Sequence, residues 1–375
     1  MKRIVLLLLA CLVFGQYAVA ETVKIGLMCP LTGSWASEGQ DMRNIVTLLN
    51  DQVNAAGGIH GQQVEVIVED DGGNPRSASL AAQKLSSSNV LAVIGTYGSA
   101  VTEAAQHIYN ESGIVQVATG STSNRLTEKD YPGFFRVCPR NDQQGDVAAR
   151  VLLQMGYRDI GILHDNSSYA KGMADETRKR LEQFRANIVF FDALTPGEQD
   201  YTATLVKLKS CKPEVIFFSG YYPEAGMLLR QKHGMGWEVP LIGGDATNNL
   251  DLVKIAGQEA ASGFYFISPP LAKDLMDGGQ ARKILADYEK KYNSLPGSVW
   301  AVLAGDAYSV IVKALRASKD CNSTCIANYL RDELKDFSGL TGQISFDRKG
   351  DRVGDVYRLY KVDRDGRFVL QPVTY

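Results

Sequence analysis

The sequence predicts an α/β protein of two doubly wound parallel-sheet domains, and three observations lead to this fold class. Apolar segments typical of buried strands alternate with amphipathic helical segments from Thr22 onward. The alternation starts again after a lone apolar segment at residues 134–137. The chain has 375 residues, 45% of them hydrophobic, which is enough for two cores. Strand–helix alternation is typical of parallel sheets with helices on both faces.

The elements of the first half follow from periodicity and from helix-end signals. Met42, Ile45, Leu49 and Val53 repeat on one helical face. The pair Asn74-Pro75 combines a capping residue with a proline suited to the first helical position. We expect strands at 22–29, 63–69, 90–94 and 114–117, and helices at 37–54, from 74 onward and from Ser99 to the residue before Gly113.

The second half repeats the pattern and adds lone strands and a terminal hairpin. We expect helices at 142–155, 172–184, 201–209, 224–233, 281–292, 299–317 and 326–334, and strands at 159–163, 187–191, 215–218, 241–242, 263–268, 342–346, 356–362 and 367–372.

Short connectors near residues 137, 264 and 344 indicate that the chain crosses three times between the two domains. We therefore expect one lobe from residues 21–138 plus 265–344 and another from 139–264 plus 345–375. Several crossings form a hinge, and a ligand is expected in the cleft between the lobes.

The N-terminus is typical of a secretory signal peptide. Lys2 and Arg3 precede an apolar run that ends at Phe14, and Ala18-Val19-Ala20 forms a small-x-small cleavage site. We expect residues 1–20 to be removed and the mature protein to be soluble and periplasmic. A lipid anchor at Cys11 is the alternative. The net charge of −2 gives no indication of nucleic-acid binding.

Five cysteines remain after the expected cleavage: Cys29, Cys138, Cys211, Cys321 and Cys325. An exported protein can form disulfides. The spacing of Cys321 and Cys325 makes them the expected pair, whereas a Cys29–Cys138 bridge stays open. The spacing of cysteine and histidine does not resemble a zinc site, so no metal and no cofactor are expected.

Two consecutive strands of the first half end in glycines and small hydroxyl residues. Thr96-Tyr97-Gly98-Ser99 follows one strand, and Ala118 to Thr122 ends the next. The carboxyl ends of parallel strands border the ligand crevice, and helix N-termini add backbone N–H groups there. We therefore expect Ser99, Gly120 and Thr122 to hold an anionic ligand group. The alternative is ordinary capping, for which Ser99 is a good N-cap.

Complementary groups follow the strands of the second half. Asp245 stands after two glycines without an adjacent lysine or arginine, so a ligand ammonium would satisfy it. The alternative is an N-cap for a helix at 247–256. Tyr169 and Tyr221 each offer an apolar face and a hydroxyl, although ordinary core tyrosines would look the same.

A loop of the first half adds Trp35 and Glu38, and Trp300 lies near a helix start. Trp35 is a candidate wall of a side-chain pocket, or packs on its own domain. The sequence contains no dinucleotide loop, phosphate loop or nucleophile elbow. This favours a binding protein over an enzyme, with an exported hydrolase as the alternative.

These features together resemble the type I periplasmic binding proteins, in particular the leucine/isoleucine/valine-binding proteins of ABC importers. The resemblance covers essentially the whole mature chain. It is carried by segments in the family's order and spacing: IGLMCPLTGSWASEGQDM, NAAGGIHGQQVEVIVEDDGGNP, VIGTYGSAVTEAA, HDNSSYAKGMA, FFDALTPGEQDYTATLVKLK and FFSGYYPEAGMLLRQ.

The resemblance implies two Rossmann-like lobes joined by a three-stranded hinge, in the manner of a Venus flytrap. It implies that Ser99 binds the ligand carboxylate and that Gly120 and Thr122 hold its carboxylate and amino groups. Tyr169 and Tyr221 match the family's site tyrosines. Asp245 stands where the family has a glutamate for the ammonium.

The side-chain pocket departs from the family pattern. Glu38 stands where branched-chain binders often have a tyrosine, with Trp35 nearby, and Tyr97 precedes the carboxylate loop. Gly73 and Gly98 occupy the positions of the family's loop disulfide, so that bridge is absent.

The function that the resemblance implies is the capture of an amino acid, of the branched-chain type or related, and its delivery to a membrane permease. We expect a monomer that does not bind nucleic acid. The alternative is a ligand-sensing receptor of the same fold for an amide or another small metabolite.

Overall fold

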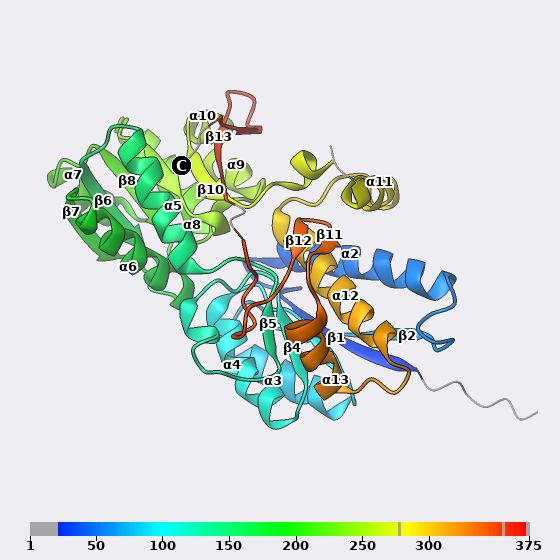
Figure 1. Ribbon diagram of the computed structural model, residues 1–375. Coiled ribbons are helices and arrows are strands. Elements are labelled where there is room, and N and C mark those ends of the chain that lie inside the picture. Colours follow the sequence, from blue (N-terminus) through cyan, green and yellow to red (C-terminus); the bar gives the residue numbers. More distant parts are fainter. Residues whose placement is uncertain (1–21, 277–278, 355–356, 373–375) are drawn as a thin grey trace, which may run out of the picture.

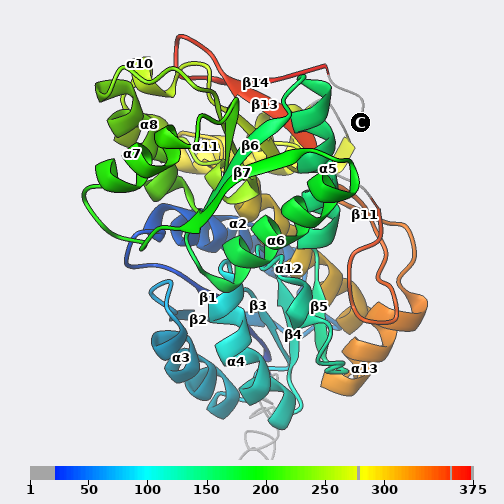
Figure 2. The same ribbon diagram turned by 90° about the vertical axis from the view of Figure 1, so that its left-hand side faces the viewer.

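The computed structural model describes residues 22–276, 279–354 and 357–372. The expected signal peptide, its cleavage site after Ala20 and the alternative anchor at Cys11 lie outside these ranges. The chain forms two lobes, each built around its own sheet, which Figure 2 shows one above the other. Figure 1 shows the same lobes with the connecting segments between them. In the described part, no helix is both long and apolar enough to cross a membrane.

The first lobe contains a five-stranded sheet in the order β2-β1-β3-β4-β5. All of its strand pairs are parallel, as expected. Alternation along β1 directs Ile25 and Leu27 to one face and Met28 to the other, so each face has its own core. The strands are β1 Val23–Cys29, β2 Val64–Asp70, β3 Ala92–Ile94, β4 Val115–Ala118 and β5 Phe134–Arg136.

Helices cover both faces of this sheet. α2 (Ala36–Ala55) packs with α12 (Val299–Ala317) on one face, and α3 (Pro75–Ser87) packs with α4 (Ser99–Glu111) on the other. The Asn74 side chain accepts a hydrogen bond from Ser77 N and caps α3, as expected. α11 (Gly279–Tyr292) contacts α2, and α13 (Ser323–Asn328) continues into a π-helical turn, Tyr329–Glu333.

The second lobe contains a seven-stranded sheet in the order β14-β13-β10-β9-β8-β6-β7. The strands from β10 to β7 are parallel, whereas β13 pairs antiparallel with β10 and forms an antiparallel hairpin with β14 at one edge. The strands are β6 Asp159–His164, β7 Asn187–Ala193, β8 Val215–Ser219, β9 Leu241–Gly243, β10 Tyr265–Ser268, β13 Arg358–Val362 and β14 Phe368–Leu370.

Helices also cover both faces of the second sheet. Two of them pack together on one face, α5 Asn141–Gln154 and α6 Ser168–Gln183. The opposite face carries α7 Thr202–Ser210, α8 Tyr222–Gly234, α9 Asp251–Ala256 and α10 Gln258–Ala261. The remaining elements are the 3-10 turns η1 Asn124–Leu126, η2 Asp245–Thr247 and η3 Ala272–Leu275, and a two-stranded sheet of β11 Phe337–Gly339 and β12 Gly342–Ile344.

The second crossing lies later in the chain than the sequence indicated. Residues 265–268 were expected in the first lobe, but they form β10, which pairs with β9 and β13 of the second sheet. That boundary was wrong because β10 finds its hydrogen-bonding partners in elements distant in sequence. The chain therefore leaves the second lobe after Ser268, and its other crossings follow β5 and β12.

The cysteines agree with the spacing argument. Cys321 and Cys325 form a disulfide, with their Cα atoms 5.2 Å apart. Cys29, Cys138 and Cys211 are not disulfide-bonded, so a Cys29–Cys138 bridge is absent.

Candidate functional site

A tight turn at the end of β3 directs the loop 96–99 toward the cleft. Gly95 has a φ of +116°, and a Cβ there would lie 2.0 Å from the Met28 carbonyl oxygen. A side chain at this position is therefore excluded. The turn leads into α4, whose N-cap is Gly98 rather than Ser99. The expected capping role of Ser99 was wrong, because its hydroxyl is turned toward the neighbouring loop.

The loops after β3 and β4 are held together by buried hydroxyl groups. Thr102 Oγ1 lies 2.8 Å from Thr96 Oγ1 and 2.6 Å from Ser121 Oγ. Ser123 N donates to Ser99 Oγ at 3.1 Å. These hydrogen bonds hold the two loops against each other, so the other residues of both loops have defined positions.

Thr122 and Gly120 lie within this fixed pair of loops. Thr122 Oγ1 is buried without a hydrogen-bond partner among the described residues. Gly120 N donates to Thr96 O at 3.2 Å, and a Cβ on Gly120 would lie 2.7 Å from the ring of Tyr97. The first lobe thus presents, near Ser99, a buried hydroxyl without a partner among the described residues, and the binding of an anionic group there stays a prediction.

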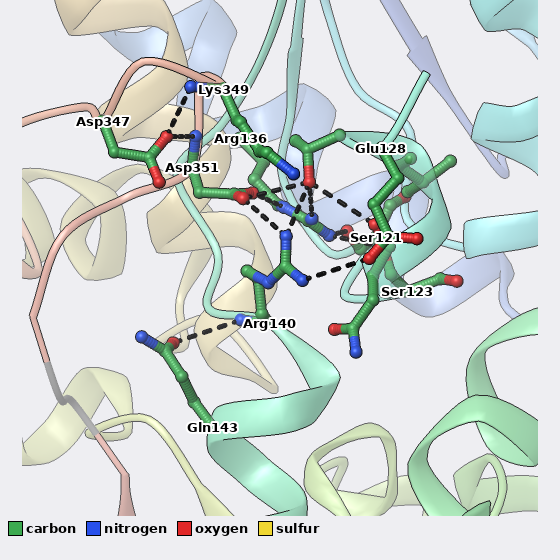
Figure 3. A network of polar contacts seen from close by, with 12 residues as sticks. Ser121, Ser123, Glu128, Arg136, Arg140, Gln143, Asp347, Lys349 and Asp351 are labelled. Carbon is green, nitrogen blue, oxygen red and sulfur yellow. Dashed lines mark hydrogen bonds and ion pairs between the residues drawn. The ribbon is translucent and has the colours of Figure 1, made fainter. Parts of the chain in front are cut away.

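A buried arginine supports the Thr122 loop from the hinge, as Figure 3 shows. Arg136 on β5 is fully buried, and its Nη1 donates to the carbonyl oxygens of Ser121 and Ser123 at 3.0 and 2.8 Å. These two residues flank Thr122. The guanidinium therefore sets the path of the loop that carries the candidate ligand hydroxyl, with the fork geometry that only arginine provides.

The same arginine is neutralised by a carboxylate from the third crossing. Arg136 Nε and Arg140 Nη1 donate to the two oxygens of Asp351 at 2.5 and 2.8 Å. Burial works to raise the pKa of Asp351, but the two guanidinium groups outweigh it and the pKa lies below its usual value. The first and third crossings are thereby joined by a buried ion pair next to the ligand loops.

Asp245 lies on the opposite side of the cleft, in the second lobe. It starts the turn η2, whereas the N-cap of α9 is Leu250, so its carboxylate does not cap that helix. Oδ2 accepts from the Tyr357 hydroxyl at 3.2 Å, and Oδ1 is buried without a hydrogen-bond partner among the described residues.

The environment of Asp245 disfavours its charge. Burial raises its pKa to about 6, although the neighbouring polar side chains of Tyr169, Gln144 and Tyr357 work against this shift. No lysine or arginine pairs with it in the part of the chain that the structure describes. A buried carboxylate in this state gains most from a cationic partner.

Tyr221 brings the two halves of the site into contact. Burial raises its pKa well above the ordinary value, and the carboxylates of Asp165 and Asp245 add to this effect. The backbone amide of Ser99 acts in the opposite direction through a hydrogen bond. Tyr221 therefore lies close both to Ser99 of the first lobe and to Asp245 of the second.

Aromatic rings from both lobes form a continuous wall. Tyr221 lies 5.3 Å from Tyr169, 4.2 Å from Trp35 and 5.6 Å from Tyr97, measured between ring centroids. Tyr97 lies 5.8 Å from Trp300. Such spacings are typical of interacting aromatic pairs. Four of the five rings belong to predicted ligand-binding residues.

Two glycines make room for the indole of Trp35. A Cβ on Gly73 would lie 2.8 Å from its ring, and one on Gly98 would lie 2.9 Å away. These are the positions where related proteins were expected to carry a disulfide. The indole packs there instead, between the two loops of the first lobe and Tyr221 of the second.

Glu38 is placed between the lobes. Its Oε1 accepts from Asn249 Nδ2 of the second lobe at 2.6 Å, and its Oε2 bonds to the Ser298 hydroxyl. Burial raises its pKa to about 8, and Asp41 and Asp251 add to this. Because both oxygens have protein partners, Glu38 joins the lobes in this structure, and its contact with a ligand stays a prediction.

A cavity of about 350 Å³ lies between the lobes and is lined in part by Trp35 and Tyr221. Its lining comes from both lobes and includes the carboxylates of Asp165 and Glu224. Burial raises the pKa of Asp165 to about 6 and also raises that of Glu224. Ser99, Thr122 and Asp245 are not among the residues lining this cavity. We call these three residues, with the side chains around them, the inner site.

Sequence reasoning missed several residues of the inner site. Gln144 on α5 is fully buried near Asp245, and neither polar atom of its side chain has a hydrogen-bond partner among the described residues. Tyr357 reaches Asp245 from the third crossing. Neither residue follows a strand or belongs to a motif, so no sequence signal indicated it. Within the described ranges, no group of three or more histidine, cysteine, aspartate or glutamate residues is placed to hold a metal ion.

Comparison with known proteins places this geometry in a family. A family model described as "Periplasmic binding protein" matches residues 22–367. The leucine-, isoleucine-, valine-, threonine-, and alanine-binding protein of Pseudomonas aeruginosa is 30% identical over 355 residues, which is 94% of this chain and 93% of that protein.

Solved structures show the same fold. The branched-chain amino acid transporter substrate-binding protein LivJ of Streptococcus pneumoniae, in complex with isoleucine, is 32% identical, with a TM-score of 0.85 over 94% of this chain and 99% of that chain. The leucine-binding protein LivK of Thermotoga maritima is 25% identical, with a TM-score of 0.86 over 93% and 98%. With this match over nearly the whole described chain, the protein belongs to the periplasmic binding protein family, with the two-lobed fold of the type I members.

Proposed function

We propose that the protein captures an α-amino acid, of the branched-chain type or related, between its two lobes and delivers it to the permease of an ABC importer. One observation carries this proposal. Asp245 has a buried carboxylate oxygen and Thr122 a buried hydroxyl, both without a hydrogen-bond partner among the described residues, and Tyr221 lies close to both Asp245 and Ser99. Such an arrangement complements the ammonium and the carboxylate of a zwitterion, since charge-assisted hydrogen bonds strengthen in a water-excluded site.

The relatives support the same class of ligand. LivJ was solved with isoleucine, and the name of the Pseudomonas aeruginosa protein covers leucine, isoleucine, valine, threonine and alanine. We propose binding without turnover, in a periplasmic monomer released by cleavage after Ala20. A sensing role for an amide or another small metabolite stays the alternative.

A thermal-shift screen against amino acids, small amides and short organic acids tests the proposal. A ligand present at 100 times its Kd adds roughly 2.7 kcal/mol to the free energy of unfolding, which is easily detected. We expect shifts with amino acids. Shifts confined to amides or organic acids would favour the sensing alternative, and a change of the ligand's NMR spectrum over hours would indicate an enzyme.

A further inference from the structure

The side-chain end of the inner site contains polar atoms that an aliphatic ligand leaves unsatisfied. Tyr97 is 1% exposed and Trp300 is 1% exposed. The hydroxyl of Tyr97 and the indole N–H of Trp300 are both buried without a hydrogen-bond partner among the described residues. Buried polar groups in native proteins are nearly always paired, so two orphans on neighbouring rings need an explanation.

Both rings lie at the end of the aromatic wall away from Asp245. The wall runs from Tyr169, whose hydroxyl interacts with Asp245 and accepts from Ala246 N at 3.4 Å, through Tyr221 to Tyr97 and Trp300. The ammonium of an amino acid belongs at the Asp245 end. Its side chain then extends along the wall toward the two orphan groups.

The chemistry of the Tyr97 hydroxyl and the Trp300 indole restricts which ligand side chains can pair with them. An indole N–H only donates, and a tyrosine hydroxyl donates or accepts, so the ligand has to bring an acceptor. A ligand carboxylate there would need a cation. The charged groups placed near Tyr97 are acidic instead, since the pKa of Tyr97 is raised by burial and further by Glu38.

We propose that the preferred ligand is an α-amino acid with an uncharged side chain that accepts a hydrogen bond, a hydroxyl or a carboxamide, received by Tyr97 and Trp300. This inference rests on the proposed amino-acid function and narrows it. An aliphatic side chain of the same shape fills the space but leaves both donors buried and unpaired, which costs affinity.

Isothermal titration calorimetry on ligand-free protein tests the inference with pairs of similar shape. Threonine and valine differ by a hydroxyl in place of a methyl group, and asparagine and leucine provide a second pair. We expect the polar member of at least one pair to bind about tenfold more tightly or better. Tyr97→Phe removes the hydroxyl and should bring that ratio down toward one, and Trp300→Phe should lower it as well.

Tyr109→Phe is the matched control. Tyr109 is equally buried, but its hydroxyl contacts Met28 Sδ on the far face of the sheet, so the ratio should stay at its original value. Tyr97→Phe removes a single oxygen atom and changes the shape of the core least. This variant therefore keeps the test valid if Trp300→Phe fails to fold.

The outcomes separate this inference from the function on which it rests. If valine and leucine bind at least as tightly as their polar partners, the inference is wrong while amino-acid capture stands. The same holds if Tyr97→Phe and Trp300→Phe leave an observed preference unchanged. If no amino acid binds, the proposed function fails and the inference with it.

Discussion

The polarity of the candidate site comes from a few single side chains. Among them, Asp245 places the strictest requirement on a ligand. It is fully buried, its pKa is raised to about 6 by burial, and no cation pairs with it among the described residues. On the other lobe, the residues that match it are neutral hydroxyls. We therefore propose that this one carboxylate sets the direction in which a zwitterion lies.

Asp245→Asn should lower amino-acid affinity by a hundredfold or more, because a ligand ammonium left without its counter-charge costs about 3–5 kcal/mol. The same substitution removes a buried charge from the empty protein, so the melting temperature without ligand should rise. Calorimetry and thermal denaturation measure the two effects. Unchanged affinity would remove Asp245 from the site.

Glu38 links closure of the cleft to pH. Its pKa of about 8 means that it is protonated in this structure at neutral pH. Opening the cleft separates it from Asn249, and a solvated glutamate has a pKa near 4.3. At a pH between these two pKa values, closure of the cleft therefore takes up a proton. Protonation of Glu38 favours the closed form at low pH, and this contribution is lost as the pH rises toward 8.

We expect ligand affinity to fall by up to about tenfold per pH unit between roughly pH 6 and 8, and to level off above that range. Below about pH 6, protonation of Asp245 weakens the binding of a ligand ammonium and opposes this trend. Glu38→Gln keeps groups that can bond to Asn249 and Ser298 but does not titrate, so this slope should flatten. Titrations at several pH values compare the two proteins. Identical pH profiles would show that Glu38 does not change protonation on closure.

At the scale of elements, two loops and an indole replace the disulfide expected at this place in related proteins. Gly98 has an ordinary φ of −86°, so its lack of a side chain is needed for space and not for backbone conformation. Its neighbour across the gap is the ring of Trp35. Packing of this loop pair therefore depends on a large residue and a small one together.

Gly98→Ala should destabilise the protein by about 1–3 kcal/mol, as overpacking does. In a Trp35→Ala background the added methyl has space, and the same substitution should cost much less. A double-mutant cycle by chemical denaturation measures the coupling. Equal costs in both backgrounds would mean that the indole does not lie against Gly98 in solution.

The crossing segments form a second cooperating unit. Asp351 neutralises Arg136 and Arg140, and Arg136 in turn holds the carbonyls on either side of Thr122. The pKa of Asp351 is lowered, so the contribution of this carboxylate to stability is present above the usual aspartate pKa. That contribution is lost as the pH falls through the lowered value.

Asp351→Ala should cost about 3–5 kcal/mol, because it leaves a fully buried guanidinium without a counter-charge. Glu69→Gln is the control, since its partner Lys84 is largely exposed and such pairs contribute about 1 kcal/mol or less. Urea unfolding at neutral pH measures both. A small effect of Asp351→Ala would show that water or a shifted chain satisfies Arg136.

For the molecule as a whole, the sequence predicted the fold class and the elements well because both depend on local periodicity. The hydroxyl-rich ends of β3 and β4 and the acidic end of β9 also followed from position, since parallel strands end at one edge. The disulfide followed from the spacing of Cys321 and Cys325.

The predictions that were wrong, and the residues that were missed, depend on contacts between segments far apart in the sequence. β10 joined the other sheet because its pairing partners lie far away in the chain. Arg136, Gln144 and Tyr357 act from segments without a motif, and Glu38 acquires its partner Asn249 only when the lobes meet. No periodicity indicates such contacts.

We propose above all that the two lobes hold one amino acid between Asp245 and the loops of Ser99 and Thr122. A crystal structure of the protein with the amino acid that gives the largest thermal shift tests it most directly. We expect the ligand ammonium within hydrogen-bonding distance of Asp245 Oδ1 and the ligand carboxylate at the hydroxyls of Ser99 and Thr122. An amino acid bound in the outer cavity beside Asp165 and Glu224, or in the reverse orientation, would contradict it.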